Sequence, residues 1–224
     1  MGMNIRRSDD RGFADHGWLK SYHTFSFADY HDPAFMGFRS LRVINEDYIA
    51  GGRGFGSHPH KDMEIITYVL EGALAHKDSM GHQENINAGD VQKMSAGTGV
   101  THSEFNADTK KPVHLFQIWI QPNKRGIPPS YYQKTIPSSF KEGLVLIDTP
   151  IQQDAQIFIG RFKAGAEHSY SIKPKRGVWL QMTAGEIDVN GARLNDSDAV
   201  AVENESTLVI KIVKNSEFLL FDLL

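Results

Sequence analysis

The sequence contains no cysteine among its 224 residues. This absence excludes disulfide bonds, thiolate catalysis and sulfur-ligated zinc together. A metal ion bound by this chain would need nitrogen and oxygen ligands, and ten histidines are present to supply the nitrogen. Candidate functional residues are therefore expected among the histidines and carboxylates.

Long apolar runs and strong charge are missing as well. No apolar run reaches the roughly 18 residues that a membrane-spanning helix needs. The net charge is only -3, and no cluster of basic residues supports a nucleic-acid-binding surface. The first residues include arginines but no apolar segment after them, unlike a secretory signal. We therefore expect a cytoplasmic protein with neither a membrane nor a nucleic acid as partner.

Helical periodicity is also absent, and strand-like runs take its place. Runs rich in β-branched and aromatic residues recur along the chain, for example "EIITYVL", "HLFQIWI" and "STLVIKIV". Short turns rich in Gly, Asn and Asp, such as "NAGD" and "VNGA", separate many of them. Many short strands divided by turns predict an all-β sandwich or barrel.

The two halves of the chain resemble each other. "YVLEGALAH" at 68–76 is echoed by "LQMTAGEIDVNG" at 180–191, and "HLFQIWI" near residue 117 by "EFLLFDL" near residue 220. Self-similarity of this kind indicates a duplicated structural unit. Two barrels in one chain can pair with each other, which favours a monomer.

A proline-rich segment separates these halves. Residues 121–143 hold four of the nine prolines and little apolar periodicity, as is typical of a linker. We therefore predict an N-terminal domain over 1–135 and a C-terminal domain over 136–224.

Two histidines open one of the predicted strands. In "HPHKDMEIITYVLEG", His58 and His60 are two positions apart, so an extended chain places both side chains on one face. Such a pair on its own is equally typical of two surface imidazoles beside a turn. A metal site would need further ligands from another strand.

A second pair supplies those ligands. His102 and Glu104 in "VTHSEFN" have the same two-residue spacing. "HSE" alone is also typical of a solvated loop, but two such pairs in one β-rich half favour a shared site. Three imidazoles and one carboxylate suit divalent iron, manganese, cobalt, nickel, copper or zinc. The equivalent part of the second half has only His168, which predicts a single metal ion per chain, held by the N-terminal domain.

The sequence around these pairs resembles the two cupin motifs. "GGRGFGSHPHKDMEIITYVLEG" is similar to the first motif and "GDVQKMSAGTGVTHSEFN" to the second. Gly72 comes one residue late, Ser95 replaces the usual proline, and four residues separate Gly97 from His102. These departures, together with "GWLKSYHTFSFADYHDPAFMGFRSLRVINED" and "HKDSMG", resemble the pirin family, and most of all the bacterial pirin-like quercetinases.

The resemblance implies a duplicated cupin fold, or bicupin, of two jelly-roll-like barrels. Carried over by position, the family's metal ligands are His58, His60, His102 and Glu104, the four residues that the spacing also indicates. Glu64 is expected near the strand entrance or as a partner that orients a ligating imidazole. His114 is expected to be structural, although a role beside the ligands stays open. The aromatic residues of the 17–47 segment are expected in the core rather than in a ligand pocket: Trp18, Tyr22, Phe25, Phe27, Tyr30, Phe35 and Phe38.

The implied activity is that of quercetin 2,3-dioxygenase, with a flavonol-like aromatic substrate, O2 and one divalent metal, Fe(II) first among the candidates. Glu104 is then both a ligand and the catalytic base for the flavonol proton. Eukaryotic pirins instead resemble metal-dependent or redox-sensing regulators that act through a protein partner, and this alternative stays open. A simple metal-binding or isomerase-like cupin is the third possibility, with no further catalytic acid in the sequence to favour it.

Overall fold

The computed structural model describes residues 2–137 and 140–224. Within these residues the regular structure consists of β-strands and one 3-10 helix, η1 (Ser8–Asp10). No helix among them is long and apolar enough to span a bilayer. The contacts within the chain separate two units, residues 12–137 with 149–153 and residues 2–11 with 140–148 and 154–224. We call these the N-terminal unit and the C-terminal unit.

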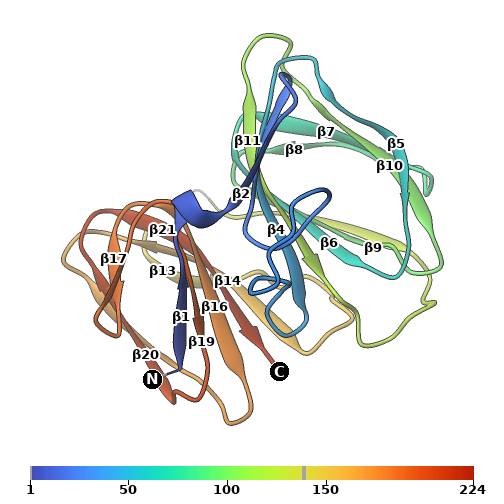
Figure 1. The fold of residues 1–224 in the computed structure, drawn as a ribbon. Coiled ribbons are helices and arrows are strands. Elements are labelled where there is room, and N and C mark those ends of the chain that lie inside the picture. Colours follow the sequence, from blue (N-terminus) through green and yellow to red (C-terminus); the bar gives the residue numbers. More distant parts are fainter. Residues whose placement is uncertain (1, 138–139) are drawn as a thin grey trace. The chain divides into compact units, whose positions relative to one another are not determined.

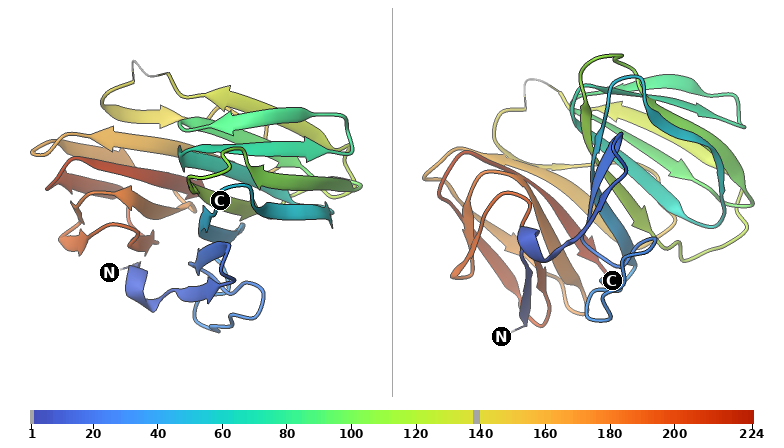
Figure 2. Two further views of the ribbon diagram at one scale, coloured as in Figure 1. Left: turned by 90° about the horizontal axis from the view of Figure 1, so that it is seen from above. Right: turned by 45° about the horizontal axis from the view of Figure 1, so that its top comes forward.

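The N-terminal unit consists of two antiparallel sheets that face each other (Figures 1 and 2). The large sheet contains, in spatial order, β12 (Ser130–Thr135), β9 (Asp90–Ser95), β6 (Glu64–Glu71), β11 (Val113–Ile120), β4 (Leu41–Ile49), β3 (Leu19–His23) and β2 (Gly12–Asp15). The small sheet contains β5 (Gly54–His60), β10 (Val100–Asn106), β7 (Ala73–Asp78) and β8 (Gln83–Asn87).

The C-terminal unit has the same construction. Its large sheet contains, in spatial order, β1 (Met3–Arg6), β19 (Ala199–Val202), β16 (Gly177–Ala184), β21 (Ser216–Leu223), β14 (Ala155–Phe162) and β13 (Gly143–Leu146). Its small sheet contains β15 (Glu167–Ser171), β20 (Thr207–Ile212), β17 (Ile187–Val189) and β18 (Ala192–Leu194).

The strand orders demonstrate the duplication. The order β9-β6-β11-β4-β3 in one unit becomes β19-β16-β21-β14-β13 in the other, and β5-β10-β7-β8 becomes β15-β20-β17-β18. The echoed segments of the sequence are therefore equivalent strands, β6 with β16 and β11 with β21. The predicted all-β, duplicated fold of two jelly-roll-like units is confirmed.

Two details differ from the sequence-based prediction. Residues 130–135 lie inside the predicted linker but form β12, which pairs with β9 and extends the large sheet. The linker prediction was therefore wrong there, because the prolines around β12 obscured the strand. At the other end, β1 belongs to the predicted N-terminal domain but pairs with β19 of the C-terminal unit, a long-range pairing that local sequence does not encode.

Candidate metal centre

The small sheet of the N-terminal unit brings the two predicted ligand pairs together. β5 and β10 are antiparallel, and their register places His102 directly opposite His58. Along β10 the side chains alternate between buried and accessible, with His102 and Glu104 on the buried side. The strand period therefore directs both side chains into the unit.

Three of the four predicted residues form a compact cluster. The ring centroids of His58 and His102 are 4.5 Å apart, and His60 lies 4.8 Å from His58 and 4.9 Å from His102. One ligating atom from each of the three rings can be chosen so that all lie within 4.8 Å of one another. Such a cluster is small enough for one metal ion to contact all three imidazoles.

Hydrogen bonds fix the orientation of two of these rings. Nδ1 of His58 lies 2.8 Å from the carbonyl oxygen of Gly56, which leaves Nε2 as the atom that can bind a metal. Nδ1 of His102 lies 3.5 Å from Nδ1 of His76, whose Nε2 is 3.1 Å from Oδ2 of Asp78. Nε2 of His102 is buried and has no hydrogen-bond partner in the described part of the chain. Buried polar atoms nearly always have a partner, and a bound metal ion would supply the partner that this nitrogen lacks.

Glu104 lies beside this cluster. One carboxylate oxygen of Glu104 and one ring nitrogen each of His102 and His76 lie within 4.8 Å of one another. Glu104 does not belong to the group that His58 and His60 form with His102. Oε2 accepts a hydrogen bond of 3.0 Å from Gln117, whereas the buried Oε1 has no partner among the described residues. The enclosed oxygen of Glu104 and the nitrogen of His102 thus form a donor set of the type that divalent transition metals bind.

Burial sets the charge state of these groups. It lowers the pKa of His60 to about 4 and that of His102 to about 3, with the neighbouring imidazoles adding to the effect. Both rings are consequently neutral at pH 7, and their lone pairs can bind a cation. Burial raises the pKa of Glu104 to about 7, so without a cation this carboxyl holds a proton at slightly acidic pH.

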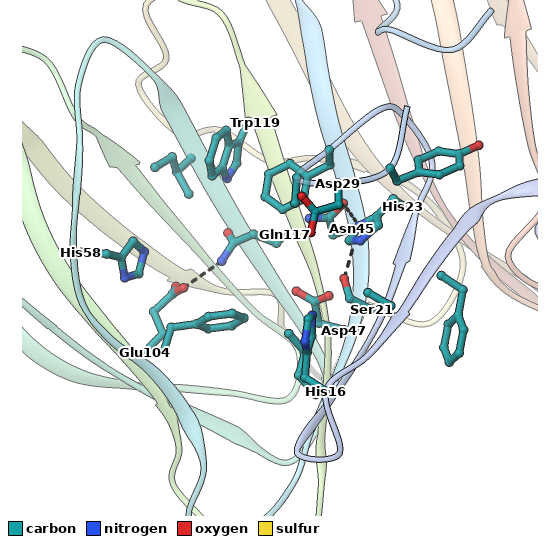
Figure 3. A pocket seen from close by; sticks show the side chains of 18 of the residues that line it. His16, Ser21, His23, Asp29, Asn45, Asp47, His58, Glu104, Gln117 and Trp119 are labelled. Atoms are coloured by element: carbon teal, nitrogen blue, oxygen red, sulfur yellow. Dashed lines mark hydrogen bonds between the residues drawn. The ribbon is translucent and has the colours of Figure 1, made fainter. Parts of the chain in front are cut away.

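The cluster lies at one side of a cavity of about 580 Å³ within the N-terminal unit (Figure 3). This volume is typical of small-molecule sites. The remaining wall is mainly apolar and aromatic, with a group of polar side chains from β3 and β4. The lining residues are Phe13, Ala14, His16, Leu19, Ser21, His23, Phe27, Ala28, Asp29, Tyr30, Asn45, Asp47, Phe55, His58, His60, Ile65, His102, Glu104, Gln117 and Trp119.

The polar part of the cavity wall was not predicted from the sequence. Figure 3 shows Ser21, His23, Asn45 and Asp47 across the cavity from His58 and Glu104. Nδ1 of His23 lies 2.9 Å from Oδ1 of Asn45 and 3.4 Å from Ser21 Oγ. The available signal was the alternation on β3 and β4, where residues two apart share a face, but which face lines a cavity depends on the other sheet.

His76 was also missed, although its segment was part of the recognised motif. It lies on β7 directly opposite Glu104 in the strand register and is 1% exposed. The spacing of His76 and Asp78 by two residues is the same signal that identified the other pairs. Its position beside the ligands became apparent only when β7 was placed next to β10.

One expectation about neighbouring residues needs correction, and two others agree with the structure. Phe27 and Tyr30 line the cavity instead of lying only in the core. Glu64 is the first residue of β6 and therefore lies at the strand entrance, as expected, where its buried carboxylate is 3.0 Å from Lys93 Nζ and 2.9 Å from Ser95 Oγ. His114 stacks on Tyr48 and lies 3.0 Å from a Glu46 oxygen, which is a structural role.

The equivalent positions of the C-terminal unit are apolar. His76 is four residues after Gly72, and the residue four after Gly185 is Val189. Val189 pairs with Ile210 as His76 pairs with Glu104. All of these C-terminal side chains belong to one buried core cluster with Leu208, two residues before Ile210. Hydrophobic packing therefore occupies the position where the N-terminal unit has its polar site.

Comparison with known proteins places the chain in a family. The pirin family model matches residues 4–120, and the model of the quercetinase C-terminal cupin domain matches residues 148–223. The chain belongs to the pirin family. The predicted family and the bicupin form of the fold are thereby confirmed.

Similar proteins extend over the full chain. A protein of Escherichia coli K12 named quercetin 2,3-dioxygenase is 46% identical over 98% of this chain and 97% of its own length. A pirin-like protein of Caulobacter vibrioides is 41% identical over 96% of both chains. The crystal structure of the bacterial pirin YhhW from Escherichia coli in complex with nickel(II) has a TM-score of 0.95 and 44% identity, over 99% of this chain and 98% of that one.

The described residues include a His/Glu group of the kind that binds metal ions, and the similar YhhW structure contains nickel(II). The fit of a metal ion rests on this chain itself, through the clustered imidazoles, the buried Nε2 of His102 and the buried Oε1 of Glu104. This donor set suits several divalent transition metals and selects none of them.

Proposed function

We propose that this pirin is a metal-dependent dioxygenase that opens the flavonol ring of quercetin-like substrates with O2 and releases carbon monoxide. The observation that carries the proposal is the group of buried, partner-less ligand atoms at the side of a largely aromatic cavity. A structural metal site would be closed by protein on every side, whereas a catalytic one keeps positions open to substrate. The names of the Escherichia coli relatives support the same activity.

The proposed ligands are His58, His60, His102 and Glu104, with one ion per chain. Iron(II) is our first candidate, with nickel, cobalt, copper, manganese and zinc as alternatives that this donor set also accepts. When bound, the metal supplies Lewis acidity that makes the flavonol 3-hydroxyl easier to deprotonate. We propose a monomer as the active form, because a duplicated chain needs no partner subunit to supply a second barrel.

Within this proposal Glu104 receives the 3-hydroxyl proton. Oε1 has no hydrogen-bond partner in the described chain, while Gln117 holds Oε2 at 3.0 Å. Without a cation, burial raises the pKa of Glu104 to about 7, and a bound cation would favour the carboxylate form that can accept a proton near neutral pH. The atoms of the overall reaction balance without a reductant, because both O2 atoms enter the ring-opened ester and carbon 3 leaves as carbon monoxide with its own oxygen.

The aromatic wall orients the substrate and excludes water from the reacting atoms. Phe27 packs edge-on against Trp119 at 5.5 Å, and Trp119 packs against His60 at 5.1 Å. These rings connect the proposed ligands to the rest of the cavity. A flat aromatic molecule that enters the cavity is thereby directed toward the metal.

The test combines metal analysis with O2 uptake. Protein loaded separately with each candidate metal is supplied with quercetin, and O2 consumption and carbon monoxide release are followed. Glu104→Gln keeps a donor oxygen and a similar shape but removes the base, so we expect retained metal and a fall of roughly 100-fold or more in turnover. Glu167→Gln, the same change on the exposed part of β15, is the matched control and should turn over quercetin at the parent rate.

Two results would count against the proposal. A Glu104→Gln protein that keeps its metal and oxidises quercetin at the parent rate would show that Glu104 is not the base. If the parent protein turns over no quercetin with any of these metals, the dioxygenase proposal is wrong. The alternative, a metal-sensing regulator of the kind that eukaryotic pirins resemble, would then replace it.

A further inference from the structure

Asp47 is a buried carboxyl in the cavity wall on the side away from the histidine cluster. It lies on β4, is 3% exposed, and is among the residues that line the cavity (Figure 3). Ser21 hydrogen-bonds the carboxyl. Oδ1 of Asp47, however, is enclosed and has no hydrogen-bond partner within the described residues.

The strand alternation explains why this carboxyl faces the cavity. Asn45 and Asp47 are two residues apart on β4, and both line the cavity. Glu46 between them faces the other way and is 3.0 Å from His114. Asn45 is itself bound to His23 at 2.9 Å. Of these acceptors on β4, Asp47 is therefore the one that retains an unsatisfied oxygen facing the cavity side of the sheet.

An unsatisfied buried carboxyl oxygen is costly. A polar atom left without a partner away from water costs about 1–3 kcal/mol, and more when it is charged. Above its pKa of about 7 the carboxyl is ionised and only accepts hydrogen bonds, so its partner in that form is a donor. Phe27 and Tyr30 pack against His23 of the same polar group, with ring centroids 5.3 Å and 6.4 Å away, and this aromatic wall favours a flat ring that carries the donor.

Asp47 and Glu104 line the same cavity and face it from different sheets, on β4 and β10 (Figure 3). One molecule of modest size can therefore bind near Glu104 and contact Asp47 at its other end.

We propose that Asp47 is a specificity-determining residue whose carboxyl accepts a hydrogen bond from a hydroxyl group on the part of an aromatic substrate that points away from the metal. This inference rests on the proposed function, because it assigns a second contact to the same substrate. It assigns to the site a preference for polyhydroxylated aromatic molecules over those with a hydroxyl at the metal-binding position alone.

The test uses two flavonols that differ in their ring hydroxyls. Quercetin carries hydroxyls on both outer rings, whereas 3-hydroxyflavone has only the 3-hydroxyl. Dissociation constants are measured without O2 at pH 8 by quenching of tryptophan fluorescence, since Trp119 lines the cavity. The metal-loaded parent is compared with Asp47→Leu, which removes the acceptor, and with Asp47→Asn, which keeps one acceptor oxygen in a similar shape.

We expect Asp47→Leu to weaken quercetin binding about 10- to 100-fold and to leave 3-hydroxyflavone within about 3-fold of the parent, the scale of one hydrogen bond to a charged group. Asp47→Asn should fall between parent and Asp47→Leu for quercetin, and it also serves as the test if the leucine variant fails to fold. Glu167→Gln changes an exposed carboxylate on β15, outside the cavity lining, and should bind both flavonols as the parent does.

The outcomes separate this inference from the proposed function. If the Asp47 variants bind both flavonols as the parent does, or weaken both equally, Asp47 does not recognise a ring hydroxyl and the inference is wrong. If quercetin-selective weakening occurs in a protein that consumes no O2 with quercetin, the Asp47 contact stands and the dioxygenase proposal fails. A parent that binds neither flavonol contradicts both.

Discussion

The Nδ1 atoms of His76 and His102 lie 3.5 Å apart, and both residues are buried. The other ring nitrogen of His76, Nε2, is 3.1 Å from Asp78, which carries the hydrogen-bond chain away from the cavity. If His76 Nε2 donates to Asp78, His76 Nδ1 is an acceptor for His102 Nδ1–H, and Nε2 of His102 is then left with its lone pair. His76 thus fixes which nitrogen of His102 can bind a metal.

His76 should accordingly control metal affinity although we do not propose it as a ligand. Replacing it by leucine leaves His102 without its orienting partner, and we expect metal affinity to fall about 10- to 100-fold, as measured by competition with a chelator. His82→Gln is the matched control. His82 bonds to the same Asp78 from the far side and is 39% exposed, so its loss should change metal affinity much less. Equal effects of the two substitutions would contradict an orienting role for His76.

His60 provides a direct test of the ligand assignment. It is only half-buried, and its ring packs against His58, His102 and Trp119 rather than in an apolar core cluster. His60→Ala should therefore remove most of the bound metal while the protein stays folded, as judged by metal analysis and circular dichroism.

His168→Ala is the control for that experiment. His168 lies on β15 of the C-terminal unit, opposite Ile210 and next to Phe162, with no metal cluster among the described residues of that unit. Metal stoichiometry in this variant should stay near one per chain. Two ions per parent chain, one of them lost with His168, would refute a single N-terminal site.

Asp47 gives a prediction about stability and pH in the metal-free protein. Burial raises its pKa from 3.8 to about 7, so the folded state holds this proton more tightly than the unfolded state. The stability that the protonated carboxyl contributes is fully present below about pH 4 and is lost as the pH rises through 7. The amide in Asp47→Asn cannot ionise, so this variant should not lose stability in this way as the pH rises.

Urea unfolding at pH 5 and pH 8 measures the effect. Between pH 5 and pH 8 the free energy of unfolding of the metal-free parent should fall by on the order of 2–4 kcal/mol more than that of Asp47→Asn. Each unit of pKa difference corresponds to about 1.4 kcal/mol. The comparison with the variant removes most of the contribution of Glu104, which titrates in both proteins. Parallel losses in parent and variant would show that the carboxyl of Asp47 is not buried in solution.

The sequence predicted the elements that depend on local pattern. The two-residue spacing of His58 with His60 and of His102 with Glu104 follows from the strand period, and the register of β5 and β10 brings His58 and His102 face to face. The duplication was likewise visible in the echoed strands. The opposite wall of the cavity was not, because the positions of Asn45 and Asp47 relative to His58 depend on how two sheets face each other. Phe27 and Tyr30 were assigned to the core for the same reason, since an aromatic residue reads alike in a core and in a cavity wall.

Gly97 lies in the loop before β10, the strand that carries His102 and Glu104, and its backbone conformation constrains this loop. Its φ of +48° lies in the left-handed region, and a Cβ atom there would be 2.1 Å from the carbonyl oxygen of Ile127. A 2.9 Å hydrogen bond from Asp62 N to Gly97 O connects the same loop to the segment between β5 and β6. Gly89 is the matched comparison, with φ of +86° and open space around its Cβ position.

Gly97→Ala should therefore destabilise the protein more than Gly89→Ala. The left-handed backbone costs a non-glycine residue about 1–2 kcal/mol at either position. At Gly97 the clash adds to this cost, because the backbone of Ile127 must move, and we expect a total loss of roughly 3 kcal/mol or more in urea unfolding. Since the loop leads directly into β10, Gly97→Ala should also weaken metal binding through displacement of His102, whereas Gly89→Ala should keep the parent's metal affinity. If the two alanine variants are equally stable, the close approach of Gly97 to Ile127 does not constrain this loop.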